Sequence, residues 1–209
     1  MTANKTIYLI RHGQTDYNLK GIVQGSGIDS DLNETGRKQA QAFYNAYNHL
    51  TFDHIYTSQL KRTHQSVEPF IKRGHSWTQM HELNEINWGI FEGVVPTPEA
   101  KNVFNQMVAS WRNGDLAKAI EGGETPLEMF ERQRRGWQQI KQSSHKNILI
   151  CMHGRAMRSF LSLVLDTPLQ EMDQYPHTNL GVYQVEVNAG SSILHLKNDT
   201  RHFENIDLF

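Results

Sequence analysis

The chain has 209 residues, of which 38% are hydrophobic and 21% are charged, and it is long enough to bury a sizeable core. Its net charge of −1 gives no general attraction to nucleic acids or anionic membranes, so any affinity for anions must be local. The single cysteine, Cys151, excludes an internal disulfide and a paired-cysteine metal motif, and it is consistent with a reducing compartment.

The first half of the chain predicts two strands, each followed by a loop or helix. An apolar run over 6–11 reads as a buried strand that enters a glycine turn. A helix is expected to begin near Asn33, because apolar residues then recur at helical spacing. A second short strand is predicted at 54–57, with Ser58 as the cap of the next helix. Residues 82–98 read as an irregular loop because glycine and proline interrupt them.

The second half begins with a mostly helical insertion over about 94–124. The start of the next helix is well marked in the sequence. Thr125 can cap it, Pro126 suits its first position, and Glu128 can close a capping box.

The last third predicts a strand, a helix and a hairpin. The strand is expected at 147–152 and the helix at 155–165, and alternating residues over 181–187 and 192–196 favour a hairpin. Strands that alternate with helices imply an α/β fold in three layers. We expect one domain over the whole chain, with a mostly parallel central sheet, helices on both faces, an edge hairpin and the helical insertion over the sheet edge.

Two segments repeat one design, in which an apolar strand is followed by a histidine and then a glycine. They end in His12-Gly13 and His153-Gly154. A lone histidine at the end of a strand is usually satisfied by the backbone, but two such strands side by side would bring both rings to one sheet edge. Arg11 adds a permanent cation with a planar fork of donors suited to phosphate. The pattern points to phosphoryl chemistry centred on a histidine.

Two further residues are candidates for the same site. Arg62 lies on the first turns of the helix after the second strand, where the simpler interpretation is a solvated surface charge. Glu85 lies beside Trp88 in the glycine-punctuated loop and could donate a proton, although a surface glutamate would look the same.

With these residues, the chain resembles the histidine phosphatase superfamily, which has the phosphoglycerate-mutase-like fold. The motifs run in family order across nearly the whole chain. They are Arg11-His12-Gly13-Gln14-Thr15 with Asn18, residues 32–40, residues 57–63, Leu83-Asn84-Glu85 through Gly89 with Glu92-Gly93, Gly122-Gly123-Glu124-Thr125, and His153-Gly154 with Arg158. A bare Arg-His-Gly triplet would be weak evidence, whereas this ordered series is specific.

The resemblance implies a role for each matching residue. His12 would attack phosphorus and become phosphohistidine, and Glu85 would protonate the leaving oxygen and then activate water. Arg11, Arg62 and His153 would surround the phosphoryl oxygens. The other substrate-binding residues would be Asn18, Gln24, Gly25 and Gly154. Because phosphoryl transfer depends mainly on positioning and electrostatics, this set predicts catalysis without a metal ion.

Two residues leave alternatives open. Arg155 replaces the small or neutral residue common in the family after the second His-Gly, so it is either an extra phosphate contact or a surface charge. The tract around Pro176-His177-Thr178 looks somewhat like the fructose-2,6-bisphosphatase branch, and His177 is either an ordinary loop residue or a member of the pocket.

Three functions fit these residues. The favoured one is a phosphomonoesterase without a cofactor that acts on small phosphorylated metabolites. The second is a phosphoglycerate mutase, which would need a 2,3-bisphosphoglycerate primer. It is disfavoured because the insertion is short and Phe203–Phe209 leaves little tail to cover the site. The third is a non-catalytic phospho-ligand binder, which is disfavoured because all the expected catalytic residue types occur together.

We expect the protein to be cytoplasmic and to act as a monomer or homodimer, with neither nucleic acid nor membrane as a partner. No apolar stretch approaches membrane-spanning length, and the four apolar residues before Arg11 are too few for a signal peptide.

The sequence lacks the residues that a cysteine-based phosphatase or a nucleotide-binding loop would need. Six residues after Cys151 stands Met157 rather than the arginine of a cysteine phosphatase, and neither a Walker loop nor a GxGxxG turn occurs.

Overall fold

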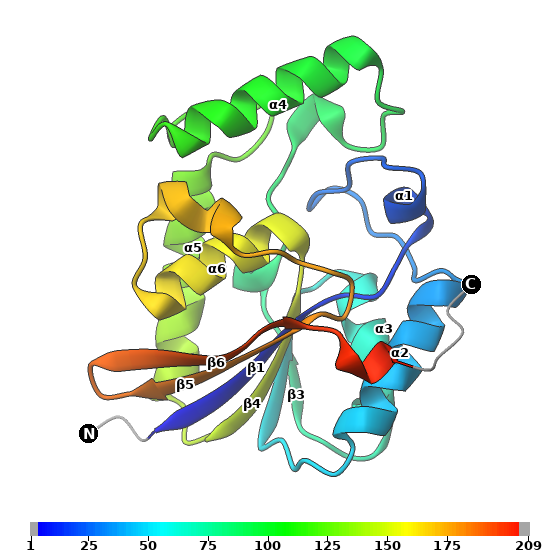
Figure 1. The fold of residues 1–209 in the computed structure, drawn as a ribbon, viewed down its shortest axis with the longest axis vertical. Helices are drawn as coiled ribbons and strands as arrows, with labels where there is room; N and C mark the ends of the chain where they lie inside the picture. Colours follow the sequence, from blue (N-terminus) through cyan, green and yellow to red (C-terminus); the bar gives the residue numbers. More distant parts are fainter. Residues whose placement is uncertain (1–3, 205–209) are drawn as a thin grey trace.

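One mixed sheet organises the computed structural model, which describes residues 4–204. Its strand order is β3-β2-β4-β1-β5-β6 (Figure 1). The first four strands are parallel to one another, β5 is antiparallel to β1, and β6 is antiparallel to β5. The strands are β1 (Lys5–Arg11), β2 (His54–Thr57), β3 (Trp77–Gln79), β4 (Asn147–Met152), β5 (Val182–Asn188) and β6 (Ser191–Asp199). The predicted α/β fold, mostly parallel sheet and edge hairpin are therefore confirmed.

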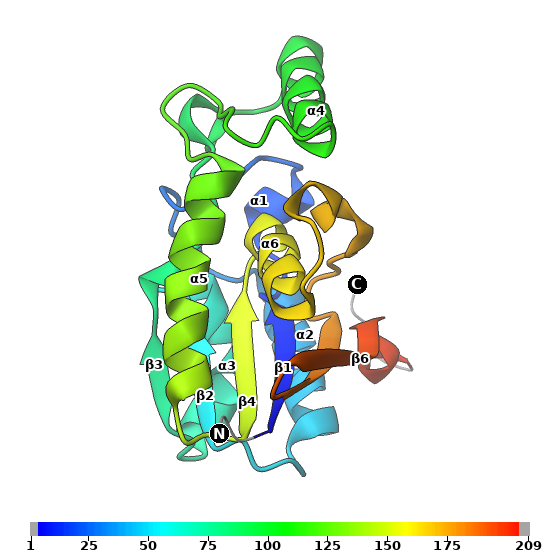
Figure 2. The ribbon, with the colours of Figure 1, turned by 90° about the vertical axis from the view of Figure 1, so that its left-hand side faces the viewer.

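Helices cover both faces of this sheet. On one face lie α2 (Glu34–Tyr47) and α3 (Lys61–Lys72), and on the other lie α5 (Pro126–Gln142) and α6 (Gly154–Leu165) (Figures 1 and 2). Two helices lie beyond the carboxyl ends of the parallel strands, namely the short α1 (Asp16–Leu19) and α4 (Pro98–Arg112), which is the helix of the predicted insertion. Short 3-10 segments occur at His81–Leu83, Gly89–Phe91, Leu169–Gln174 and Arg201–Phe203.

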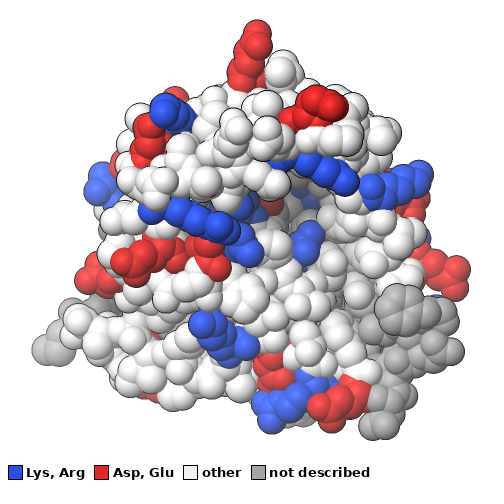
Figure 3. Space-filling view, turned by 45° about the horizontal axis from the view of Figure 1, so that its top comes forward, with Lys and Arg blue, Asp and Glu red and all other residues white. Residues whose placement is uncertain are grey.

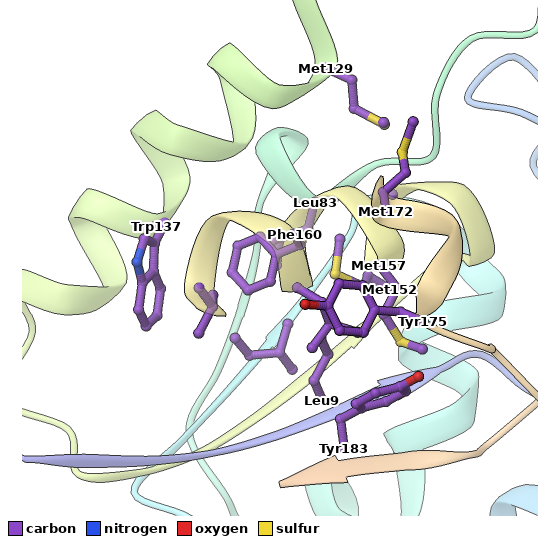
Figure 4. Close-up of a cluster of buried hydrophobic side chains, with 14 of the residues drawn as sticks. Leu9, Leu83, Met129, Trp137, Met152, Met157, Phe160, Met172, Tyr175 and Tyr183 are labelled. Atoms are coloured by element: carbon purple, nitrogen blue, oxygen red, sulfur yellow. The ribbon is translucent and has the colours of Figure 1, made fainter. Parts of the chain in front are cut away.

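The alternation of strand side chains divides the core in two. Leu9 of β1 and Met152 of β4 belong to the larger apolar cluster, which packs under α5 and α6 around Phe160 (Figure 4). Ile10 and Cys151 point the other way, into the cluster beneath α2 and α3. Residues 148–152 are all buried, as expected for a central parallel strand covered on both faces.

The helix starts show where local signals suffice. Asn33 caps α2, and Thr125 and Glu128 form the predicted capping box of α5. The prediction that Ser58 caps α3 was wrong, because Leu60 holds that position and has no side-chain cap. The buried Ser58 hydroxyl instead bonds the Leu60 N–H at 3.1 Å and the ring of His153 at 2.8 Å.

The edge strand β3, the loop at 82–98 and the C-terminal residues lie away from the centre of the sheet. The three-residue β3 was not predicted, since a short edge strand carries little alternation. The loop expected at 82–98 contains 3-10 turns and otherwise irregular backbone. Of the predicted short tail at 203–209, residues 205–209 lie outside the described part. Within residues 4–204 no helix combines the length and the apolar character needed to cross a membrane.

Candidate active site

The two histidines meet because β1 and β4 are neighbouring parallel strands. Arg11 pairs with Met152 in the sheet, and the next backbone N–H, that of His12, donates to the Met152 carbonyl at 3.0 Å. The rings of His12 and His153 consequently lie with their centroids 5.2 Å apart. A cavity of about 300 Å³ opens at this end of the sheet, and Figure 3 shows Lys and Arg side chains around and inside the hollow. It is lined by Arg11, His12, Asn18, Ile22, Val23, Gln24, Glu85, Trp88, Phe104, Gly154, Arg155 and His177.

The tautomer of His12 follows from one contact. Its Nδ1 lies 2.7 Å from the carbonyl oxygen of Gly13, and because a carbonyl can only accept, Nδ1 must carry the proton. The lone pair is thus on Nε2, which makes no hydrogen bond to any residue in 4–204. Burial, reinforced by the charges of Arg62 and Arg11, holds the pKa of His12 well below its ordinary value. His12 is therefore a neutral ring with one nitrogen free to act as a nucleophile.

The His12 loop is held by close backbone packing. The Gly13 N–H donates to the Ser66 hydroxyl at 2.8 Å. A Cβ at Gly13 would lie 2.6 Å from the carbonyl oxygen of Gly36, at the start of α2, so only glycine fits here. The glycine after the histidine is thus required by the approach of α2.

His153 has both ring nitrogens occupied. Nδ1 accepts from Nε of Arg62 at 3.1 Å, so the proton of the neutral ring is on Nε2, which donates to the Ser58 hydroxyl at 2.8 Å. Burial and the charge of Arg62 hold the pKa of His153 well below its ordinary value. His153 is thus a neutral, oriented ring beside His12.

Arg62 is an internal residue of the site and not a surface charge. Its side chain is fully buried, and besides His153 it donates to the carbonyls of Ile28 at 2.6 Å and Gly25 at 3.1 Å. Burial lowers its pKa to about 10, so it stays charged at neutral pH. Gly25, expected among the substrate-binding residues, does not line the cavity. Its carbonyl holds Arg62, and a Cβ there would lie 2.0 Å from Glu92.

Arg11 presents a donor to the cavity. Its NH1 donates to the His177 carbonyl at 3.0 Å and lies 3.3 Å from that ring's Nδ1. Its buried Nε has no hydrogen-bond partner among the described residues. Burial lowers the pKa of Arg11 to about 10, so the group remains a cation. Arg11 is thus a cation in the cavity wall, and its charge favours a bound anion.

Glu85 is oriented by the first turn of α6. One carboxylate oxygen accepts from the N–H groups of Ile86 at 2.9 Å and Ala156 at 2.8 Å, and the other accepts from that of Arg155 at 3.0 Å. A carboxylate at a helix N-terminus is electrostatically favourable. These contacts bring the irregular loop against α6 and place Glu85 in the cavity wall, next to Gly154.

The remaining predicted binding residues differ in what they can offer. Asn18 accepts from the Thr15 N–H at 3.2 Å through its amide oxygen, which leaves its NH₂ group for the cavity. Gln24 lines the cavity, but its amide nitrogen bonds Thr15 at 2.7 Å and its oxygen accepts from Ser30 at 2.6 Å. Gly154 is the first residue of α6, in the cavity wall.

The structure decides both alternatives that were left open. Arg155 is 8% exposed and lines the cavity, so the surface-charge interpretation was wrong. His177 also lines the cavity, and its ring lies 3.1 Å from where a Cβ of Gly154 would be. Burial and the charge of Arg11 lower the pKa of His177 to about 3, so this ring too is neutral.

Several contacts of the site lack a signal in the sequence. Ser58 orients His153, Trp88 lines the cavity, and Asp173 anchors Arg155 at 2.6 Å. Ser58 and Trp88 fall within the motifs at 57–63 and 83–89, but the contacts that they make join segments far apart along the chain. Asp173 belongs to no motif. Between residues 4 and 204, no group of three or more His, Cys, Asp or Glu side chains is arranged to hold a metal ion.

Comparisons with known proteins agree with this geometry. The sequence profile of the histidine phosphatase superfamily (branch 1) matches residues 7–200. A protein of Hydrogenobacter thermophilus named "Putative phosphoserine phosphatase 2" is 26% identical over 205 residues, which cover 95% of this chain and 97% of that protein. The structure of YhfR from Bacillus stearothermophilus superposes with a TM-score of 0.82 at 27% identity and covers 95% of this chain and 98% of that one.

A plant relative matches only in part. The 2-carboxy-D-arabinitol-1-phosphatase of Triticum aestivum is 26% identical over 191 residues, which cover 91% of this chain but 37% of the wheat protein. The chain belongs to the histidine phosphatase superfamily, as its motifs predicted. Its named relatives are phosphatases, and the enzyme class defined here is that of a phosphoric monoester hydrolase.

Proposed function

We propose that this protein hydrolyses small phosphorylated metabolites through a phosphohistidine on His12, without a metal ion or organic cofactor. The observation that carries the proposal is the state of His12. The ring is neutral, Nδ1 donates to a backbone carbonyl, and the lone pair of Nε2 is unengaged in a cavity with cationic walls. A non-catalytic phosphate binder has no need for a nucleophile prepared in this way.

The proposed reaction has two steps. In the first, Nε2 of His12 attacks phosphorus, the bond to the leaving oxygen breaks, and Glu85 gives its proton to that oxygen. In the second, Glu85 takes a proton from water, the water oxygen attacks phosphorus, and the N–P bond breaks. Phosphate leaves, His12 is neutral again and Glu85 is protonated for the next cycle.

Fixed cations supply the electrostatic part of catalysis. Arg11 and Arg62 carry permanent charge close to His12, since both lower its pKa. With the Asn18 amide and the Gly154 N–H, they would stabilise charge on the equatorial phosphoryl oxygens, where a transferring phosphoryl group needs it. His153, whose two ring nitrogens bond Arg62 and Ser58, would act by holding Arg62 in position. This arrangement performs the task that a divalent cation performs in other phosphoryl-transfer sites.

The names of the relatives support small phosphate esters as the substrate class, without favouring one ester. One is named for phosphoserine and another for 2-carboxy-D-arabinitol 1-phosphate, and both of these are small phosphate esters. A cavity of about 300 Å³ is at the small end of the range for ligand sites, which fits a metabolite rather than a phosphoprotein.

The proposal is tested by hydrolysis of an aryl phosphate in the presence of a chelator. We expect full activity with EDTA and none above background in His12→Ala, with labelled phosphate trapped on histidine only in the wild type. Loss of activity with EDTA, or activity that survives in His12→Ala, would contradict it. Incubation with 3-phosphoglycerate, with and without 2,3-bisphosphoglycerate, should give phosphate release. Isomerisation that depends on the bisphosphate would identify a mutase instead.

A further inference from the structure

Arg155 is a buried cation in the cavity wall that the proposed reaction does not use. It is the second residue of α6, directly after Gly154, and its backbone N–H orients Glu85. Its side chain is 8% exposed and faces the same cavity as His12. A charge is retained at such a position only with compensating contacts, so the surroundings of this guanidinium show what it can bind.

Two tryptophans and one aspartate hold the Arg155 side chain in place. The guanidinium carbon lies 5.9 Å from the ring centroid of Trp88 and 5.6 Å from that of Trp111, within the range of cation–π contacts. NH1 donates to Oδ1 of Asp173 at 2.6 Å. The two indoles are themselves stacked, with centroids 5.5 Å apart. Because packing restricts the side chain before a ligand arrives, it can bind one at a small cost in entropy.

Asp173 does not neutralise this region. Its carboxylate also accepts from Nε of Arg112 in α4 at 2.6 Å and from Arg158 in α6. Three guanidinium groups thus share one carboxylate, and they hold the pKa of Asp173 below its ordinary value even though burial opposes this. The cluster of Arg112, Arg155, Arg158 and Asp173 has a surplus of positive charge beside the cavity.

The Arg155 guanidinium also has N–H donors that bond no other residue within 4–204. Only NH1 of its guanidinium makes a hydrogen bond to another residue within 4–204, and the remaining nitrogens are not among the fully buried atoms that lack a partner. They are therefore not fully buried, and the residue that carries them lines the cavity. A guanidinium anchored through one nitrogen, with its other donors beside a ligand cavity, suits a carboxylate or phosphate.

We propose that Arg155 binds a second anionic group of the substrate, so that this enzyme prefers phosphate esters that also carry a carboxylate or a second phosphate. This inference rests on the proposed function, since it places the reacting phosphate at His12. Because both groups share a cavity of about 300 Å³, the two anionic groups must be separated by a short chain of a few atoms. The specificity would then come from a residue that departs from the family pattern.

The competing explanation is a structural one, in which Arg155 only connects α6 to the 3-10 segment Leu169–Gln174 that carries Asp173. Arg112 provides a matched control for it. Arg112 contacts the same carboxylate at the same distance, but its side chain is 59% exposed and is not part of the cavity lining. A loss caused by disturbing Asp173 should therefore appear in both variants, whereas a loss of anion binding should appear in one.

The experiment compares three substrates that share a three-carbon chain. Glycerol 3-phosphate has no second anion, 3-phosphoglycerate replaces its terminal hydroxymethyl group by a carboxylate, and glycerol 1,3-bisphosphate adds a second phosphate. The measured quantity is the ratio of kcat/KM for each acidic substrate to kcat/KM for glycerol 3-phosphate. Comparison of the two ratios shows which anionic group Arg155 prefers.

We expect the wild type to favour at least one acidic substrate by about tenfold or more, the effect of one well-formed ionic contact. The ratio should fall to near one in Arg155→Gln, recover in part in Arg155→Lys, and stay at the wild-type level in Arg112→Gln. A wild-type ratio near one overturns the proposal, even if Arg155→Gln does not fold. An equal loss of kcat/KM on all three substrates in Arg155→Gln also overturns it. So does a fall of the ratio in Arg112→Gln as large as the fall in Arg155→Gln.

Failure of this inference is distinguishable from failure of the proposed function. The chelator-resistant hydrolysis of an aryl phosphate by the wild type, and its loss in His12→Ala, test the reaction alone. If that activity is present and the wild-type ratio is near one, the reaction stands and the role of Arg155 does not.

Discussion

The two strand–histidine–glycine segments share one local design and end in different states. After β1, the ring of His12 donates from Nδ1 to the next carbonyl, and its Nε2 has no partner among the described residues. After β4, the ring of His153 accepts from Arg62 on one nitrogen and donates to Ser58 from the other. Both rings are buried, and burial with nearby arginines lowers the pKa of each.

The difference shows how one motif can supply two functions. A ring with an unengaged nitrogen lone pair can form a bond to phosphorus, whereas a ring with both nitrogens bonded can only donate or orient. Backbone contacts decide the state of His12, because its partner is the adjacent residue. Side chains from α3 and the loop before it decide the state of His153. Five measurements test this contrast and the site around it.

Replacement of each histidine should give the largest difference. We expect His12→Gln to lose at least about 10⁴-fold in kcat, because the covalent route disappears. We expect His153→Gln to lose less than the about 10²- to 10³-fold that removal of a direct donor costs, because its ring nitrogens bond Arg62 and Ser58 and act only by positioning. Steady-state hydrolysis of an aryl phosphate measures both. Equal losses in the two variants would remove the distinction between nucleophile and positioned ring.

The role proposed for Glu85 as proton carrier can be separated from the role proposed for His12 as nucleophile by varying the leaving group. Glu85→Gln should slow hydrolysis of an alkyl phosphate by about 10²- to 10⁴-fold, because a poor leaving group needs its proton. An activated aryl phosphate should be slowed far less, since its leaving oxygen departs unprotonated. Glu121→Gln, at an exposed carboxylate of the insertion, serves as the control. If both esters are slowed equally in Glu85→Gln, another group is the acid.

The neutral state of both rings predicts a dependence of stability on pH. The pKa of each is lowered in the folded protein, whereas in the unfolded chain it is near 6.5. Below about pH 6.5 the unfolded chain therefore binds more protons than the folded one, so the free energy of unfolding falls as pH decreases. Urea unfolding at pH 7.5 and pH 5 should show a clear loss at pH 5.

Nuclear magnetic resonance can test the neutral state of the two rings directly, because His177 and His202 also have a lowered pKa and contribute to the same loss. The imidazole shifts of His12 and His153 should stay those of neutral rings from pH 8 to pH 5. Arg62→Gln should raise the pKa of both, because after burial Arg62 is the next cause of each shift. Protonation of either ring near pH 6.5 in the wild type would refute the neutral state.

The smallest expected effect comes from the hydroxyl that orients His153. Ser58→Ala removes a partner of the His153 ring and of the Leu60 N–H, so the free energy of unfolding should fall by about 1–3 kcal/mol. Activity should fall by about tenfold or less, since the ring keeps Arg62. Ser159→Ala is the matched control, because the hydroxyl of this buried serine has no partner among residues 4–204. A larger loss in the control would show that packing, not the hydrogen bond, is responsible.

Much of the fold and the site was predictable from local signals. The apolar runs before His12 and His153 identify two central strands, and Thr125 with Glu128 marks a helix start within one turn. The order of the motifs identified the family and gave a role to Arg62 and Glu85, which were already candidates from their positions. Local signals did not extend to β3, whose three residues pair at an edge, or to Ser58, whose hydroxyl bonds a residue 95 positions away.

Strand and helix periodicity and capping act over a few residues, so the order of residues along the chain already places the two histidines and their glycines at the ends of strands. The state of each of these side chains depends on contacts that form only when the chain folds. The unengaged nitrogen of His12, the two bonds of His153 and the buried, anchored cation of Arg155 all depend on contacts between distant segments. Burial and hydrogen bonding set protonation and orientation, and both are properties of the packed molecule.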